Sequence, residues 1–126
     1  MRLIQKRILC VADNEGSCLI LTTWLKREGH RVLAAAGPED ALRRAAAVRF
    51  ELIVVYQRLP GEVALRLCTE LRTRAPETPV LFISSIHVPP TREQVVAAGA
   101  QELLVDDGDD GKLVAAVLRL TDGRGA

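Results

Sequence analysis

The sequence has few of the features that mark membrane, secreted or nucleic-acid-binding proteins. Its 3 cysteines are an odd number and are not closely spaced, which argues against a disulfide framework and fits a reducing cytosol. No apolar run reaches the roughly 18 residues of a membrane span, and the apolar run after the charged start is too short for a signal peptide. The formal net charge is only +1, so charge gives no reason to expect binding to nucleic acid or an anionic membrane. We therefore expect a cytoplasmic protein that binds neither.

What is present is the composition of an ordinary folded domain. Of the 126 residues, 48% are hydrophobic and 26% are charged, which is typical of globular proteins. A chain of this length forms one domain and buries roughly two-thirds of the surface that its unfolded form exposes. We expect residues 1–126 to form a single domain, with a core from about residue 7 to residue 120.

Five short apolar runs alternate with five stretches of helical spacing. Strands are predicted at 8–12, 31–36, 52–55, 80–83 and 101–105, and helices at 18–28, 37–48, 62–74, 91–98 and 112–120. With short loops and right-handed crossovers, this alternation predicts an α/β protein whose parallel sheet is covered on both faces. In such a sheet, sites form at the carboxyl ends of the strands. The stretch 50–61 is central, because it carries the third strand and delivers Tyr56 to that edge.

Short motifs follow or precede each strand in a recognisable order. They are Asp13-Asn14-Glu15, Glu28-Gly29-His30, Leu59-Pro60-Gly61, Ser84 and Ala97-Ala98-Gly99-Ala100. With these motifs the chain resembles the receiver domain of bacterial two-component response regulators, over residues 7 to about 120. The resemblance implies a flavodoxin-like (βα)5 three-layer sandwich with parallel strand order 2-1-3-4-5.

The resemblance also implies a phosphorylation pocket, and the sequence departs from it. Receivers phosphorylate an aspartate at the end of the third strand, where this chain has Tyr56. Of the family's two acidic residues that hold Mg²⁺, only Asp13 remains, because Ala12 replaces the first. The family's lysine at the end of the fifth strand falls on Asp106, and Ser84 matches the family's Ser/Thr. Since a phenol cannot form an acyl phosphate, we predict a degenerate pocket.

Charge at this pocket also argues against phosphorylation. Phosphoryl transfer needs cations to neutralise the oxygens, whereas Asp106 adds a negative charge. Two like charges about 4 Å apart repel by about 4 kcal/mol at an effective dielectric near 20. We expect no cofactor, and Mg²⁺ is not favoured, because Asp13 and Asp106 with a carbonyl near Arg58 are close to the minimum ligand set. Asp13 is better explained as a helix N-cap, with Asn14 as an equal candidate for that cap. The Tyr56 hydroxyl either donates to one of these carboxylates or only fills space.

Two surfaces are candidates for binding other proteins. In receivers, as the resemblance implies, histidine kinases and phosphotransfer helices dock on the first helix, and the face of the fourth helix, fifth strand and fifth helix serves pairing. An exposed apolar residue on the first helix is consistent with such docking, although isolated exposed leucines are common. The expected partners are a histidine kinase, a phosphotransfer protein, an output domain of the same protein, or a second copy. The candidate interaction residues are Leu19, Trp24, Val95, Val96, Leu103 and Leu118.

Two charged clusters are interpreted as solvated surface. The acidic turn 106–111 lacks EF-hand spacing, because its twelfth position is Val117. The arginines of the second and third helices are expected on opposite faces of the sheet, with no aromatic residues between them to stack bases. These are Arg43, Arg44, Arg49, Arg66, Arg72 and Arg74.

The function that the sequence predicts is that of a non-phosphorylatable, receiver-like protein-interaction module in two-component signalling, without enzymatic activity. Two alternatives stay open. One is a flavodoxin-like domain that senses a metal or small molecule through Asp13, Tyr56, Ser84 and Asp106. The other is a phosphorelay receiver with a non-standard acceptor, for which Asp13 is the candidate.

Overall fold

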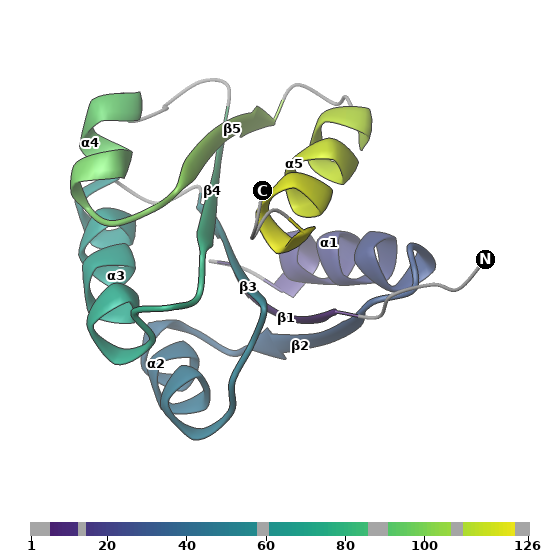
Figure 1. Ribbon diagram of the computed structural model, residues 1–126, viewed down its shortest axis with the longest axis horizontal. Helices are drawn as coiled ribbons and strands as arrows, with labels where there is room; N and C mark the ends of the chain where they lie inside the picture. The colour runs from purple at the N-terminus through teal and green to yellow at the C-terminus, as the bar shows by residue number, and fades with distance from the viewer. Residues whose placement is uncertain (1–5, 13–14, 58–60, 86–90, 107–109, 123–126) are drawn as a thin grey trace.

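The computed structural model describes residues 6–12, 15–57, 61–85, 91–106 and 110–122. Its elements alternate along the chain: β1 (Arg7–Ala12), α1 (Glu15–Arg27), β2 (Arg31–Ala35), α2 (Pro38–Ala47), β3 (Leu52–Gln57), α3 (Gly61–Arg74), β4 (Val80–Ser85), α4 (Arg92–Ala97), β5 (Glu102–Asp106) and α5 (Asp110–Asp122). The five strands form one parallel sheet in the order β2-β1-β3-β4-β5 (Figure 1). This confirms the predicted fold class and strand order.

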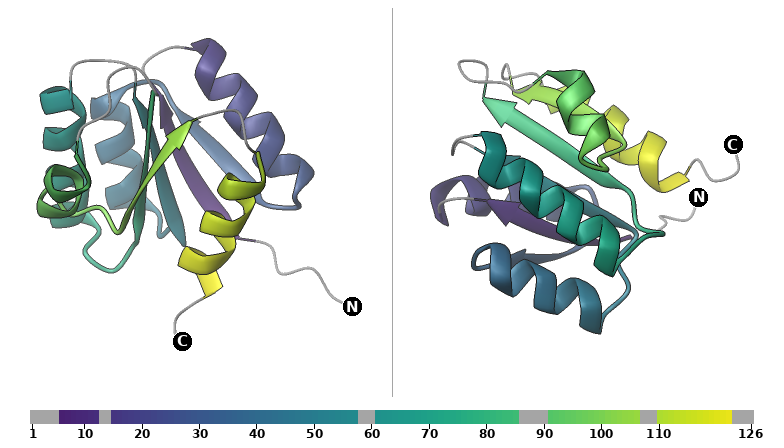
Figure 2. Two further views of the ribbon diagram at one scale, coloured as in Figure 1. Left: turned by 90° about the horizontal axis from the view of Figure 1, so that it is seen from above. Right: turned by 90° about the vertical axis from the view of Figure 1, so that its left-hand side faces the viewer.

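Alternate residues of each strand enter two separate cores, one on each face of the sheet. On one face, Leu9, Ile53 and Phe82 pack beneath α2, α3 and α4. On the other face, Cys10 and Val54 pack beneath α1 and α5 (Figure 2). Strands buried on both faces read as continuous apolar runs, which explains why the central strands were found from the sequence.

The placement of α2 and α3 on opposite faces was wrong, because both lie on the same face and pack against each other. The chain moves in one direction across the sheet from β2 to β5, so right-handed crossovers put α2, α3 and α4 on one side. The step from β1 to β2 runs the other way, which puts α1 on the opposite side. The arginines of α2 and α3 therefore belong to one side of the molecule.

Several helix ends are fixed by local chemistry. Gly29, just after α1, has φ 95, the left-handed conformation that glycine adopts at the end of a helix. Thr91 accepts a hydrogen bond from the Gln94 amide at 3.0 Å, and the Gln94 side chain accepts one from the Thr91 amide at 2.9 Å. This reciprocal capping box begins the short helix α4.

No helix in the described parts of the chain is long and apolar enough to cross a membrane.

Candidate functional site at the carboxyl edge of the sheet

Tyr56 lies in a row of register partners near the carboxyl edge of the sheet. Ala12 pairs with Tyr56, Tyr56 with Ile83, and Ile83 with Leu104. All four contribute to the core beneath α1 and α5, with Ala12 and Ile83 buried and Tyr56 half-buried. The Tyr56 ring therefore lies beside the methyl group of Ala12 on β1, and the two residues belong to a packed, largely apolar part of the sheet.

Ser84 lies one residue further along β4, in register with Gln57 and Val105. Its side chain is fully buried, and its Oγ finds no hydrogen-bond partner within the described structure. Leaving a buried hydroxyl unpaired costs about 1–3 kcal/mol, so this is a position that favours a polar group or water.

Of the remaining predicted pocket residues, only the backbone of Asp106 is described by the structure. Asp106 is the last residue of β5 and is in register with Ser85, while Asp13 and Arg58 lie outside the described residues. A cation held by Asp13 and Asp106, and a hydrogen bond from Tyr56 to either carboxylate, therefore stay predictions. Among the residues that the structure does describe, no cluster of three or more His, Cys, Asp or Glu side chains could hold a metal.

Three of the predicted interaction residues are exposed on helices. Leu19 on α1 is 67% exposed, Val96 on α4 is 52% exposed and Leu118 on α5 is 55% exposed. Single exposed apolar side chains are common on protein surfaces, so this exposure leaves the three residues accessible to a partner and does not by itself show a binding surface.

The other three predicted interaction residues lie deeper. Trp24 and Leu103 are half-buried, each packed against one of the two cores. The assignment of Val95 to the surface was wrong, because its side chain is fully buried beneath α4. Neighbouring helical residues point about 100° apart, so Val96 faces solvent while Val95 faces the sheet.

The cysteine on α3 offers no nucleophile. Burial raises the pKa of the Cys68 thiol to about 12, so the thiol stays protonated at neutral pH.

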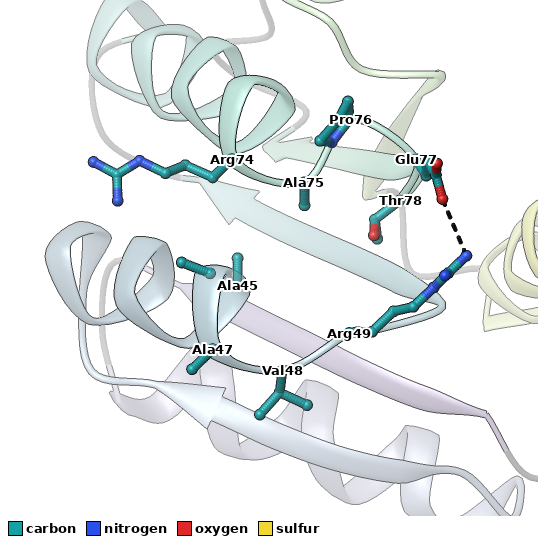
Figure 3. A pocket seen from close by; sticks show the side chains of 10 residues that line it. Ala45, Ala47, Val48, Arg49, Arg74, Ala75, Pro76, Glu77 and Thr78 are labelled. Carbon is teal, nitrogen blue, oxygen red and sulfur yellow. Dashed lines mark ion pairs between the residues drawn. The ribbon is translucent and has the colours of Figure 1, made fainter.

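Sequence reasoning missed a hollow of about 310 Å³ at the opposite edge of the sheet, between the C-terminal ends of α2 and α3 (Figure 3). Arg49 and Glu77 face each other there, with 3.3 Å between guanidinium and carboxylate. Both side chains are more than three-quarters exposed, at 79% and 78%, so their attraction is largely screened by water. The strand order combined with right-handed crossovers would have placed these helices side by side.

Comparisons with known proteins agree with this fold. The sequence profile of the response regulator receiver domain matches residues 8–118. The chain is 32% identical over 82 residues to the Bacillus subtilis alkaline phosphatase synthesis transcriptional regulatory protein PhoP, covering 65% of this chain and 34% of that protein. It is 37% identical over 103 residues to the Pseudomonas aeruginosa sensor histidine kinase AruS, covering 77% of this chain and 10% of that protein.

A solved structure of a response regulator shows a similar fold together with sequence similarity. A response regulator from Burkholderia pseudomallei, which contains a phosphorylated aspartic acid, a calcium ion and citrate, is 29% identical with a TM-score of 0.75. The match covers 92% of this chain and 69% of that one. The two curated relatives are much longer than this chain, which spans about a third or less of the length of each.

Proposed function

Because the chain belongs to the response regulator receiver domain family, we propose that it serves two-component signalling as a protein-interaction module that does not accept a phosphoryl group. The observation that carries this proposal is Tyr56. It lies near the carboxyl edge of the central strand, between Ala12 and Ile83, at the position where the family resemblance places the acceptor aspartate. A phenol there offers no carboxylate for an acyl phosphate.

Two neighbouring changes support the same proposal. Ala12 is buried and packed beside Tyr56, so it supplies no ligand where the family has an acidic one. Asp106 ends β5, where the family's lysine would offset the charge on phosphoryl oxygens. A carboxylate there opposes the charge stabilisation that phosphoryl transfer requires. The Burkholderia relative holds a phosphorylated aspartic acid and a calcium ion. Ala12, Tyr56 and Asp106 of this chain disfavour such phosphorylation.

With the edge closed to that chemistry, function would lie on the outer faces of the helices. Leu19 on α1 is the most exposed large apolar side chain of the described chain. Val96 and Leu118 present further apolar surface on α4 and α5. A histidine kinase, a phosphotransfer protein or an output domain are the partners proposed for these faces, and two copies could pair through α4 and α5.

The direct test is incubation with acetyl phosphate and Mg²⁺, followed by intact-protein mass measurement. We expect no phosphoryl adduct, while a receiver with its aspartate intact is labelled under the same conditions. Beryllofluoride with Mg²⁺ should leave the fluorescence of Trp24 unchanged. A stable adduct on the wild-type chain would refute the proposal. An adduct that is lost in Asp13→Asn would instead identify Asp13 as a non-standard acceptor.

Ser84 favours a second candidate, in which the degenerate pocket senses a small ligand or a metal. Its buried hydroxyl has no hydrogen-bond partner among the described residues, and a bound polar molecule would satisfy such a group. Calorimetric titration with Mg²⁺, Mn²⁺ and Ca²⁺ separates the candidates. We expect no binding. Heat of binding that disappears in both Asp13→Asn and Asp106→Asn would favour sensing over the interaction module.

A further inference from the structure

Lys6 joins three elements at the amino edge of the sheet, far from the candidate site. Its carbonyl accepts a hydrogen bond from the Arg31 amide at 2.9 Å, which ties the start of β1 to the start of β2. Its amide donates to Nδ1 of His30 at 3.4 Å. Its ammonium donates to the carbonyl of Thr121, in the last turn of α5, also at 3.4 Å. Figure 2 shows the end of α5 on the same side of the molecule as the start of β1.

The contact with Lys6 selects the tautomer of the neutral His30 ring. An imidazole nitrogen that accepts a hydrogen bond carries no proton, so the neutral ring must hold its single proton on Nε2. The ring is half-buried, and the preceding turn is fixed by Gly29 at φ 95 and by the bond from the His30 amide to the Leu25 carbonyl at 3.3 Å. The imidazole is therefore held against the Lys6 backbone by the chain itself.

Charged groups from three separate segments of the chain act on this ring. Burial lowers the pKa of His30, the carboxylates of Glu28 and Glu51 raise it, and the ammonium of Lys6 lowers it. Glu28 lies in the turn before β2, and Glu51 lies just before β3, where its Oε1 accepts a hydrogen bond from the Arg7 amide at 2.6 Å. Since burial is the largest of these effects, the folded state favours the neutral ring.

We propose that His30 and Lys6 form a proton-sensitive link between the amino edge of the sheet and the end of α5. When a proton from solvent binds Nδ1, the ring becomes an imidazolium and loses its acceptor. The Lys6 amide then faces an N–H group and a positive charge, so the Lys6 backbone moves away. Its ammonium no longer holds the Thr121 carbonyl, and the last turn of α5 loosens. The device is independent of the carboxyl edge and of whether the chain is phosphorylated.

The proposal is tested by NMR on the whole chain over about pH 8 to 5. We expect the neutral His30 ring to carry its proton on Nε2. The His30 ring, the Lys6 amide and the Thr121 carbonyl should shift with one common midpoint. Exchange of the Lys6 amide, corrected for its intrinsic pH dependence, should accelerate about fivefold on protonation, as loss of one ordinary hydrogen bond predicts. The proposal would be overturned if the neutral ring carried its proton on Nδ1, or if the shift and exchange rate of the Lys6 amide did not change as His30 titrates.

Three variants separate the steps. His30→Gln keeps an acceptor that does not titrate, so the transition at Lys6 and Thr121 should vanish, and its persistence would refute the role of His30. His87→Gln removes the other of the 2 histidines and should change nothing, whereas loss of the transition would transfer the effect to His87. Lys6→Met should leave the response of the residue 6 amide intact and abolish that of the Thr121 carbonyl. A Thr121 response that survives would overturn the connection to α5.

Discussion

Gly99 occupies a position at which any side chain is strained. Its φ is 107, and a Cβ built there would overlap the Cγ of Arg72 on α3. Strain at such a φ costs about 1–3 kcal/mol, and the overlap adds to it because the Arg72 stem must move. We expect Gly99→Ala to lower the free energy of unfolding by at least about 2 kcal/mol, measured by urea denaturation.

A matched control for this prediction lies at Gly37. Its φ of 168 is extended backbone that any residue adopts, and no atom lies within 4 Å of a Cβ built there. Gly37→Ala should stay within about 0.5 kcal/mol of wild type. Adding Arg72→Ala to Gly99→Ala should recover the steric part of the loss and leave the backbone part. Equal losses for both glycines would contradict the strain assigned to residue 99, both from its φ and from its contact with Arg72.

Because of Asp40, the free energy of unfolding depends on pH in the acid range. Its carboxylate accepts hydrogen bonds from the Ala36 amide at 2.8 Å and from Arg44 at 2.9 Å, and Arg43 binds its other oxygen at 2.5 Å. The hydrogen bond from the Ala36 amide has the largest effect and the one from Arg44 the next, and both lower the pKa of the Asp40 carboxyl from its ordinary value of 3.8. A lowered folded-state pKa stabilises the fold fully above the ordinary value, and this stabilisation is lost as pH falls through the folded-state value.

Asp40→Asn should therefore flatten the acid limb of the stability curve. Urea denaturation between about pH 7 and pH 2.5 provides the measurement, with the slope of stability against pH as the readout. Glu39→Gln, which removes the neighbouring exposed carboxylate, serves as the control and should keep the wild-type slope below pH 4. If Asp40→Asn kept that slope too, the bond network around Asp40 would not be its source.

At the scale of one element, α4 has a buried face and an exposed face in adjacent residues. Val95 is fully buried in the core and Val96 is 52% exposed. Val95→Ala removes buried methyl groups and leaves a cavity, so it should cost about 2 kcal/mol. Val96→Ala should change stability by less than about 0.5 kcal/mol, because its side chain already contacts water and Ala favours helix. Thermal unfolding of both variants checks this, and equal effects would contradict the assigned rotation of α4.

The elements themselves were largely predictable, while their ends and helical rotation were less so. Continuous apolar runs identified the three central strands β1, β3 and β4, but β3 extends to Gln57 because its backbone still pairs with β4 beyond the apolar run. The helix of residues 18–28 in fact begins at Glu15, since polar residues suit the first turn of a helix. Val95 was misplaced because two adjacent valines give no period by which to choose the inner one.

At the scale of the whole molecule, the fold follows from strand order and crossover handedness. The receiver resemblance supplied the order, and it implied that α2 and α3 share one face. Assigning them to opposite faces left the hollow between their ends, beside Arg49 and Glu77, unpredicted. The candidate site was predictable only as positions at strand ends, and the register that pairs Tyr56 with Ala12 comes from the structure. That the Oγ of Ser84 has no partner among the described residues follows only from packing in three dimensions, and the sequence carries no signal for it.

This whole-molecule scaffold predicts that receiver chemistry can be restored by a few residues. Three residues that differ from the family pattern lie at the carboxyl edge of the sheet: Ala12, Tyr56 and Asp106. This placement follows from the strand order, the register of β1 with β3 and the position of Asp106 at the end of β5. Combining Tyr56→Asp, Ala12→Asp and Asp106→Lys would supply an acceptor, a second Mg²⁺ ligand beside Asp13, and a cation for the phosphoryl oxygens. We expect acetyl phosphate with Mg²⁺ to label this triple variant, as measured by intact mass.

Each single substitution should fail to restore labelling, because each leaves one part of the charge stabilisation missing. Tyr56→Asp alone would leave Asp106 at the end of β5, where a carboxylate disfavours a phosphoryl group and a lysine would favour one. Circular dichroism of the triple variant distinguishes a failure of chemistry from a failure to fold. A folded triple variant that stays unlabelled would show that the loops beyond these strands have also left receiver geometry. Labelling of Tyr56→Asp alone would show that neither Ala12 nor Asp106 closes the pocket, so the loss of phosphorylation would rest on the single residue Tyr56.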